Sequence, residues 1–118
     1  MSYKEKAQDI YSMMGQGQLL EAFDKYYGDK VVMTEPRGTR EGKATCRDYE
    51  VQFLGMVKEF HGLEINSIAS DEENGVTFIE STMDVTFQDG NRVKMEQISR
   101  QQWEGDHIVH ERFYYNNG

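Results

Sequence analysis

The sequence predicts an α+β fold in which three N-terminal helices pack on a mainly antiparallel sheet. Two observations indicate this class. Hydrophobic side chains recur at helical spacing over residues 1–60. Over residues 61–118, apolar and polar side chains alternate in four stretches that are separated by glycine-containing turns. The chain of 118 residues suits one domain with its own core. Because it shows neither an internal repeat nor a linker, we expect a single domain over residues 1–118.

Two helices are predicted before residue 28. Ser2 and Glu5 have the spacing of an N-terminal capping box, and apolar side chains follow at helical spacing over residues 7–14. The Gly-Gln-Gly sequence at residues 15–17 ends this helix. A second helix is expected over residues 19–27, and the glycine after it is placed as its C-terminal stop.

A short strand and a longer helix complete the first half of the chain. The strand is expected over residues 31–34 and ends at Glu35, because a residue before proline is pushed towards extended geometry. Residues 38–42 are predicted to form a turn. A helix then runs over residues 43–60. The residues that share its apolar face are Cys46, Tyr49, Phe53, Met56 and Phe60.

The second half is predicted to be a meander of four strands, at residues 61–71, 76–87, 92–103 and 107–115. Its register depends on the turn at residues 88–90. A three-residue loop with glycine in the left-handed position pairs Phe87 with Asn91 and places Met83 opposite Met95. A two-residue loop would turn charged side chains to the apolar face, so burial favours the longer loop. We expect the same loop length at the other two turns.

This register puts polar side chains at the centre of the face that the helices should cover. Ser67 is expected opposite Ser81, Ser81 opposite Gln97, and Glu111 opposite Gln97 or Ser99. A carboxylate on a covered face is unfavourable unless it is hydrogen-bonded or neutralised. Burial should raise the pKa of Glu111 and make it a candidate proton carrier near neutral pH. The alternative is a structural carboxylate held by its neighbours.

The other face of the sheet mixes charged residues with five apolar ones: Ile68, Phe78, Ile98, Ile108 and Tyr114. No predicted helix is left to cover this outer face. We therefore expect a homodimer that associates through it, and plain exposure to solvent is the alternative.

Composition and charge exclude several classes of protein. A net charge of −8 disfavours binding to nucleic acid or to an anionic membrane surface. No apolar run is long enough for a membrane helix, and the N-terminus lacks the apolar core of a signal peptide. The single Cys46 fits a reducing compartment, so we expect a cytoplasmic protein. His107 and His110 lack companions at metal-ligand spacing, and no cofactor-binding motif is present, so we expect neither metal nor cofactor.

The order of elements resembles the cone-shaped fold of the nuclear transport factor 2-like superfamily, and its SnoaL-like branch is similar over nearly the whole chain. The matching segments are residues 26–33, residues 35–42 and residues 107–115. The resemblance implies a strongly curved sheet that encloses a pocket together with the helices. The superfamily contains ketosteroid isomerases, polyketide cyclases, epoxide hydrolases and non-catalytic binding domains, so the fold does not decide the function.

The resemblance also implies roles for individual residues. Glu35 matches the general base of ketosteroid isomerases, and Tyr11 lies close to the position of their oxyanion-hole tyrosine. Ser99 stands where their second oxyanion donor is an acid, which argues against steroid-type isomerisation. The Asp-Arg-Asp arrangement of the epoxide hydrolases has no counterpart at Gln97, Ser99 and Gln101.

The leading hypothesis is cofactor-independent acid/base chemistry of the isomerase or cyclase type on a small apolar carbonyl compound. Glu111 and Glu35 are its candidate acid and base. The residues expected to bind the substrate are Tyr11, Ser81, Gln97, Ser99, Trp103, Phe113 and Tyr115. The alternatives are a non-catalytic pocket for a small apolar or amphipathic ligand and a dimerisation module.

Overall fold

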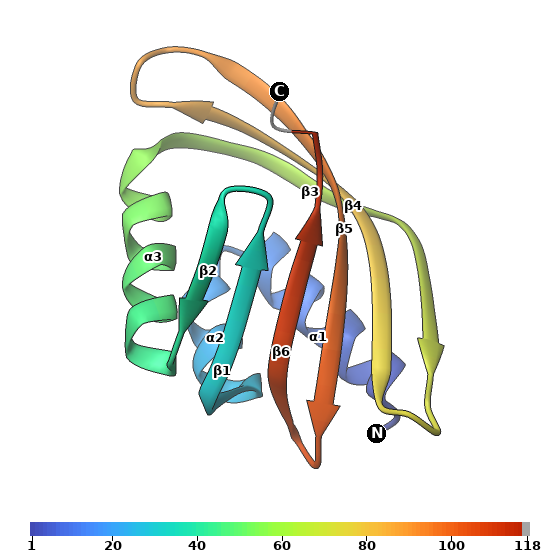
Figure 1. Ribbon diagram of the computed structural model, residues 1–118. Coiled ribbons are helices and arrows are strands. Elements are labelled where there is room, and N and C mark those ends of the chain that lie inside the picture. The colour runs from blue at the N-terminus through green and yellow to red at the C-terminus, as the bar shows by residue number, and fades with distance from the viewer. Residues whose placement is uncertain (117–118) are drawn as a thin grey trace.

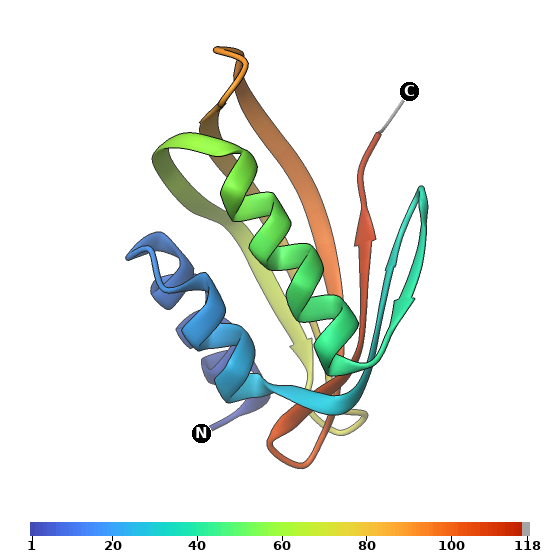
Figure 2. The ribbon, with the colours of Figure 1, turned by 90° about the vertical axis from the view of Figure 1, so that its left-hand side faces the viewer.

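The computed structural model describes residues 1–116, and over this range a layer of helices lies inside the curve of one sheet (Figures 1 and 2). The helices are α1 (Tyr3–Gly15), α2 (Leu19–Tyr26) and α3 (Lys43–Met56). The strands are β1 (Tyr27–Glu35), β2 (Gly38–Glu41), β3 (Val57–Asp71), β4 (Val76–Phe87), β5 (Arg92–Glu104) and β6 (His107–Tyr114). They lie in the order β2-β1-β6-β5-β4-β3, and the β1–β6 pair is parallel. The predicted α+β fold class is confirmed.

The first helix is fixed at its N-terminus by two carboxylates. The predicted capping box is present, since the Glu5 N–H donates to Ser2 Oγ at 3.0 Å and the Ser2 N–H donates to Glu5 Oε1 at 2.9 Å. In addition, the Glu72 carboxylate accepts from the backbone N–H groups of Tyr3 and Lys4, at 2.8 and 3.0 Å. Because Glu72 lies in the turn between β3 and β4, it ties the start of α1 to the sheet.

Two helix ends and one predicted turn differ from the sequence-based expectation. Helix α2 ends at Tyr26 because Tyr27 joins β1 and pairs with β6. Helix α3 ends at Met56, and residues 57–60 instead begin β3 opposite the end of β4. Residues 38–41, predicted as part of a turn, form β2 and pair antiparallel with β1. In all three places the hydrogen bonds of the sheet outweigh the local pattern.

The predicted register holds in the middle of the meander. Met83 lies opposite Met95, Ser81 lies opposite Gln97, and the Phe87 N–H donates to the Asn91 carbonyl oxygen at 2.8 Å. The three-residue loop is therefore right at this turn. It is wrong at the other two turns, where the loops are residues 72–75 and residues 105–106.

Extra residues in two strands change which side chains face the helices. Asn66 is an extra residue in β3, and Ile65 rather than Ser67 lies opposite Ser81. Ile68 pairs with Ile79 and packs against the core. The predictions of a Ser67–Ser81 pair and of an outward Ile68 are wrong, because the loop at residues 72–75 is one residue longer than predicted and reverses the faces of β3 next to the turn. The bulge at Asn66 then returns Ile65 to the predicted inner face.

A second bulge, at Val109 in β6, changes the surroundings of Glu111. Glu111 lies opposite Gln101 rather than Gln97 or Ser99. Ile108, which was expected on the outer face, is 0% exposed in the core. Ile108 is turned inward because the loop before β6 has two residues and not three. The bulge at Val109 then restores the predicted face of Glu111, and the two shifts together change its partner.

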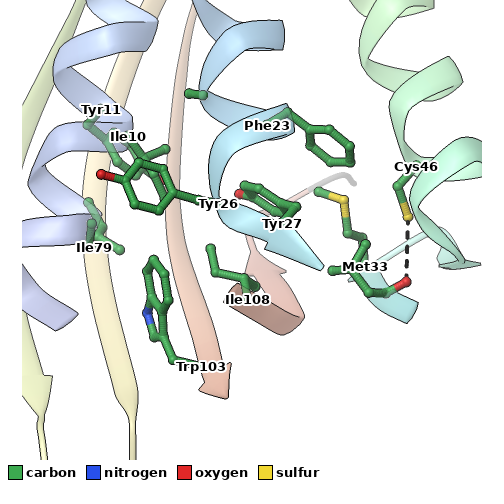
Figure 3. Packing of buried hydrophobic residues seen from close by; sticks show 13 residues of the cluster. Ile10, Tyr11, Phe23, Tyr26, Tyr27, Met33, Cys46, Ile79, Trp103 and Ile108 are labelled. Atoms are coloured by element: carbon green, nitrogen blue, oxygen red, sulfur yellow. Dashed lines mark hydrogen bonds between the residues drawn. The ribbon is translucent and has the colours of Figure 1, made fainter. Parts of the chain in front are cut away.

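The hydrophobic core lies between the helices and the inner face of the sheet (Figure 3). Trp103 packs against Tyr26, with 5.9 Å between the ring centroids, and its Nε1–H donates to Thr77 Oγ1 at 2.9 Å. Three large apolar side chains on the outer face, Phe78, Ile98 and Tyr114, are exposed. Within residues 1–116, no helix combines the length and the apolar character needed to cross a membrane.

Candidate functional site

A cavity of about 500 Å³ lies between the helices and the inner face of the sheet. The main apolar side chains of its wall are Ile10, Met14, Phe23, Phe53, Met83 and Phe113. The acidic ones are Glu35, Glu50, Glu96 and Glu111, and the basic ones are Arg37, Arg40 and Lys94. A space of this size with mostly apolar walls and a few polar groups is typical of a small-molecule site.

Glu111 on β6 contributes to the lining of this cavity, although only 1% of its surface is exposed to solvent. Three side chains donate hydrogen bonds to its carboxylate: Tyr27 O–H to Oε1 at 2.5 Å, Ser99 O–H to Oε2 at 2.6 Å and Gln101 Nε2–H to Oε2 at 2.9 Å. Burial raises the pKa of Glu111, and the three donors oppose this shift without cancelling it.

The amide of Gln101 is oriented by a chain of hydrogen bonds that reaches into the core. Trp103 Nε1–H donates to Thr77 Oγ1, and the Thr77 O–H donates at 2.8 Å to Gln101 Oε1. Because Oε1 of Gln101 is thus occupied, its Nε2–H faces Glu111 as a donor. Trp103, which was expected to bind substrate, is not among the residues that line the cavity and acts on the site through this chain.

The remaining predicted residues of the inner face gather around Tyr11. Tyr11 and Ser81 line the cavity, whereas Ser99 is fully buried behind it. Burial raises the pKa of Tyr11, the negative charge of Glu111 raises it further, and hydrogen bonding with Ser99 and Ser81 opposes the shift. Tyr11 is therefore a neutral hydroxyl at physiological pH, able to donate to an oxygen of a ligand.

A second cluster of polar side chains surrounds Glu35, at the end of β1. Arg40 Nη1 lies 2.6 Å from Glu35 Oε2, and the Tyr115 O–H donates to Glu35 Oε1 at 3.1 Å. The guanidinium carbon of Arg40 lies 3.6 Å from the ring centroid of Tyr49. Both oxygens of Glu35 are thus engaged. The sequence reading did not foresee this group, because it took β2, which carries Arg40, for a turn.

Glu50 on α3 is a site residue that the sequence reading missed. Burial raises its pKa to about 7, the charges of Glu111 and Glu35 add to the rise, and Arg40 opposes it. The spacing of residues in the sequence already indicated that Glu50 faces inward. Glu50 lies four residues after Cys46 and three before Phe53, and these two residues were placed on the inward face of the helix.

Seven of the nine predicted site residues line the cavity: Tyr11, Glu35, Ser81, Gln97, Glu111, Phe113 and Tyr115. Ser99 and Trp103 do not line it but hydrogen-bond to groups around it. Across the described residues, no cluster of three or more His, Cys, Asp or Glu side chains is arranged to hold a metal ion.

The protein has three helices inside a curved six-stranded sheet, with a cavity between the two layers. This architecture defines a protein of the nuclear transport factor 2-like class. The family model of the SnoaL-like domain matches residues 1–115, and the chain belongs to this family. The resemblance seen in the sequence is thereby confirmed. No curated protein matches the chain.

Solved structures support the same assignment. The chain is 26% identical to a candidate SnoaL-like polyketide cyclase from Mesorhizobium loti, with a TM-score of 0.82 over 98% of this chain and 100% of that one. A candidate isomerase from Bacillus subtilis is 17% identical, with a TM-score of 0.81 over 95% and 84%. An epoxide hydrolase from M. tuberculosis is 16% identical, with a TM-score of 0.78 over 97% and 82%. The last two structures, at 17% and 16% identity, show that they share the fold of this chain.

Proposed function

We propose that this SnoaL-like domain binds a small apolar carbonyl compound and moves a proton on it by acid/base chemistry, without a cofactor. The observation that carries the proposal is that two carboxylates, Glu50 and Glu111, share one mostly apolar cavity and that burial raises the pKa of both. Acid/base catalysis near neutral pH requires groups of this kind. The similarity to a candidate polyketide cyclase, at 26% identity, supports the same class of reaction.

The surroundings of the acidic residues suggest separate roles. Among the residues that the structure describes, none hydrogen-bonds to the Glu50 carboxylate, so it is free to take a proton from the carbon beside the carbonyl group. The Tyr11 hydroxyl donates to the carbonyl oxygen as negative charge develops there. Where the ketone carries a neighbouring carbon–carbon double bond, that double bond shifts as the enolate collapses, and Glu111, in its protonated form, supplies a proton at the far carbon and becomes a carboxylate. Glu35 is the weaker candidate for the base because Arg40 and Tyr115 engage both of its oxygens.

The proposal predicts deuterium incorporation into a bound ketone. In heavy water, proton nuclear magnetic resonance should show loss of the signal from the C–H beside the carbonyl for at least one member of a panel of cyclic ketones and polyketide-like compounds. Because removing a general acid or base typically lowers the rate by a factor of about 100 or more, we expect Glu50→Gln to exchange the proton beside the carbonyl at least that much more slowly. Glu111→Gln should slow deuterium incorporation at the second carbon to the same extent.

Glu104→Gln, at an exposed acid at the end of β5, is the matched control and should retain the exchange rate. Compounds that bind without any deuterium incorporation would overturn the catalytic proposal. They would instead favour the second candidate function, a non-catalytic ligand pocket. That reading has its own support in the three hydrogen bonds that already satisfy Glu111.

We also propose that two copies associate through the outer face of the sheet, where Phe78, Ile98 and Tyr114 are exposed on neighbouring strands. A charge at the centre of this face should prevent association, because an unpaired charge is costly to bury. Ile98→Glu is therefore expected to halve the mass measured by light scattering. Gln8→Glu, on the exposed side of α1, should leave the mass unchanged. A monomeric wild-type protein would contradict the proposal.

A further inference from the structure

We propose that Arg40 binds the carboxylate of the ligand, so that the substrate class is small apolar keto acids rather than neutral ketones. This inference rests on the proposed function for its carbonyl chemistry, but it depends on different atoms.

The guanidinium of Arg40 is held in place on two sides. Nη1 pairs with Glu35, and one face of the guanidinium plane stacks on the ring of Tyr49. The Arg40 side chain is only 17% exposed and lines the cavity. A guanidinium fixed in this way is pre-organised, so little conformational freedom remains to be lost when a ligand binds.

The other edge of the guanidinium has no partner. Nε and Nη2 are buried and form no hydrogen bond with any residue of the described range 1–116. These two nitrogens carry adjacent, parallel N–H groups, which form the fork that matches the two oxygens of a carboxylate. Buried donors without a partner are unfavourable, and more so when they belong to a charged group. The unpaired edge therefore indicates that an acceptor is missing.

Two other arginines of the chain show what this edge binds. Nε and Nη2 of Arg47 donate to the two oxygens of Asp24, at 2.8 and 3.1 Å. The same atoms of Arg92 donate to the two oxygens of Asp84, at 3.0 and 2.9 Å. Each of these arginines pairs with a carboxylate at the fork, whereas Arg40 pairs with Glu35 at Nη1.

The charges around the cavity permit an anionic ligand. Arg37 and Lys94 also line the cavity, so that with Arg40 three basic side chains stand against four acidic ones. Burial keeps Glu50 and Glu111 from ionising as readily as exposed carboxylates, which reduces the repulsion between them and a bound anion. The apolar side chains of the wall then surround the rest of the ligand.

The test compares two probes that differ by one charge, 4-oxocyclohexanecarboxylate and its methyl ester. Titrations followed by nuclear magnetic resonance give both dissociation constants, and the Nε–Hε signal of Arg40 reports contact at the fork. We expect the acid to bind at least about tenfold more tightly than the ester and to shift this signal, since a charged hydrogen bond has this strength.

Arg40→Lys keeps the positive charge and can still pair with Glu35, but it lacks the fork. We expect it to lose the preference for the acid while its affinity for the ester stays within about twofold. Arg47→Lys makes the same change where Asp24 already occupies the fork, and it should retain the preference. Unfolding curves establish that both variants fold.

Each outcome separates this inference from the proposed function. Equal binding of acid and ester by the wild type, or an undiminished preference in Arg40→Lys, would overturn the role of Arg40 even if deuterium exchange takes place. A preference that requires Arg40, without any deuterium exchange, would establish the carboxylate site and exclude the proposed proton transfer.

Discussion

Replacing Ile108 with alanine is expected to lower the free energy of unfolding by about 2–5 kcal/mol, the range for large-to-small substitutions in a well-packed core. Ile108 is completely buried in β6, beside Trp103. The alternating pattern of the strand had placed it on the outer face, where the same substitution would have little effect. Urea denaturation followed by circular dichroism measures the difference.

Ile65→Ala is the matched control, because Ile65 is 38% exposed on the edge strand β3. Ile65→Ala should lower the free energy of unfolding by less than about 1 kcal/mol, as substitutions at most exposed positions do. Similar losses at both positions would mean that the two-residue loop before β6 does not turn Ile108 into the core.

Glu50→Gln is expected to stabilise the protein above neutral pH. The pKa of Glu50 rises from 4.5 to about 7 on folding, so the folded state binds more protons than the unfolded state between these values. The wild type therefore loses stability as the pH rises through this window, by up to about 3 kcal/mol at 1.36 kcal/mol per unit. Glutamine stays neutral and avoids this loss.

Urea denaturation of both proteins between pH 4 and pH 8 tests the prediction. The difference in unfolding free energy should be small at pH 4 and should widen in favour of Glu50→Gln up to pH 8. The pKa of Glu111 is also raised, but Glu111 is present in both proteins, so most of its contribution cancels. Glu104→Gln should follow the wild type at every pH. Parallel curves for wild type and Glu50→Gln would exclude a raised pKa at Glu50.

The parts of the fold that local rules determine could be predicted from the sequence. The capping box at Ser2 and Glu5 and the loop closed by Gly90 depend on residues a few positions apart, and both are present. The extra residues Asn66 and Val109 could not be foreseen, because a bulge has no residue signature that distinguishes it from a regular strand.

Glu111 was nevertheless placed on the correct face, because two one-residue errors cancel. The turn before β6 is one residue shorter than predicted, which reverses the faces from His107 onward. The bulge at Val109 adds one residue and restores them. Only the residues between the turn and the bulge, Ile108 among them, were assigned to the wrong face.

The site was less predictable than the fold, since it depends on long-range pairing. The ion pair between Glu35 and Arg40 requires the β1–β2 hairpin, which the glycine-rich sequence concealed. Tyr27 reaches Glu111 only because α2 ends one residue early. Glu50 is the exception, because its helical spacing already placed it beside Cys46 and Phe53 on the inward face.

A chain of hydrogen bonds runs from Trp103 through Thr77 and Gln101 to Glu111. The site residues in this chain and those outside it therefore differ in how freely they can be substituted during evolution. The carboxylate at its end depends on side chains that also hold the core together, so substitutions there affect folding and chemistry at once. Arg40 and Glu50 lie on β2 and α3, outside this chain. New ligand preferences can therefore arise by exchanging side chains on the hairpin and α3, while the residues around Glu111 stay the same.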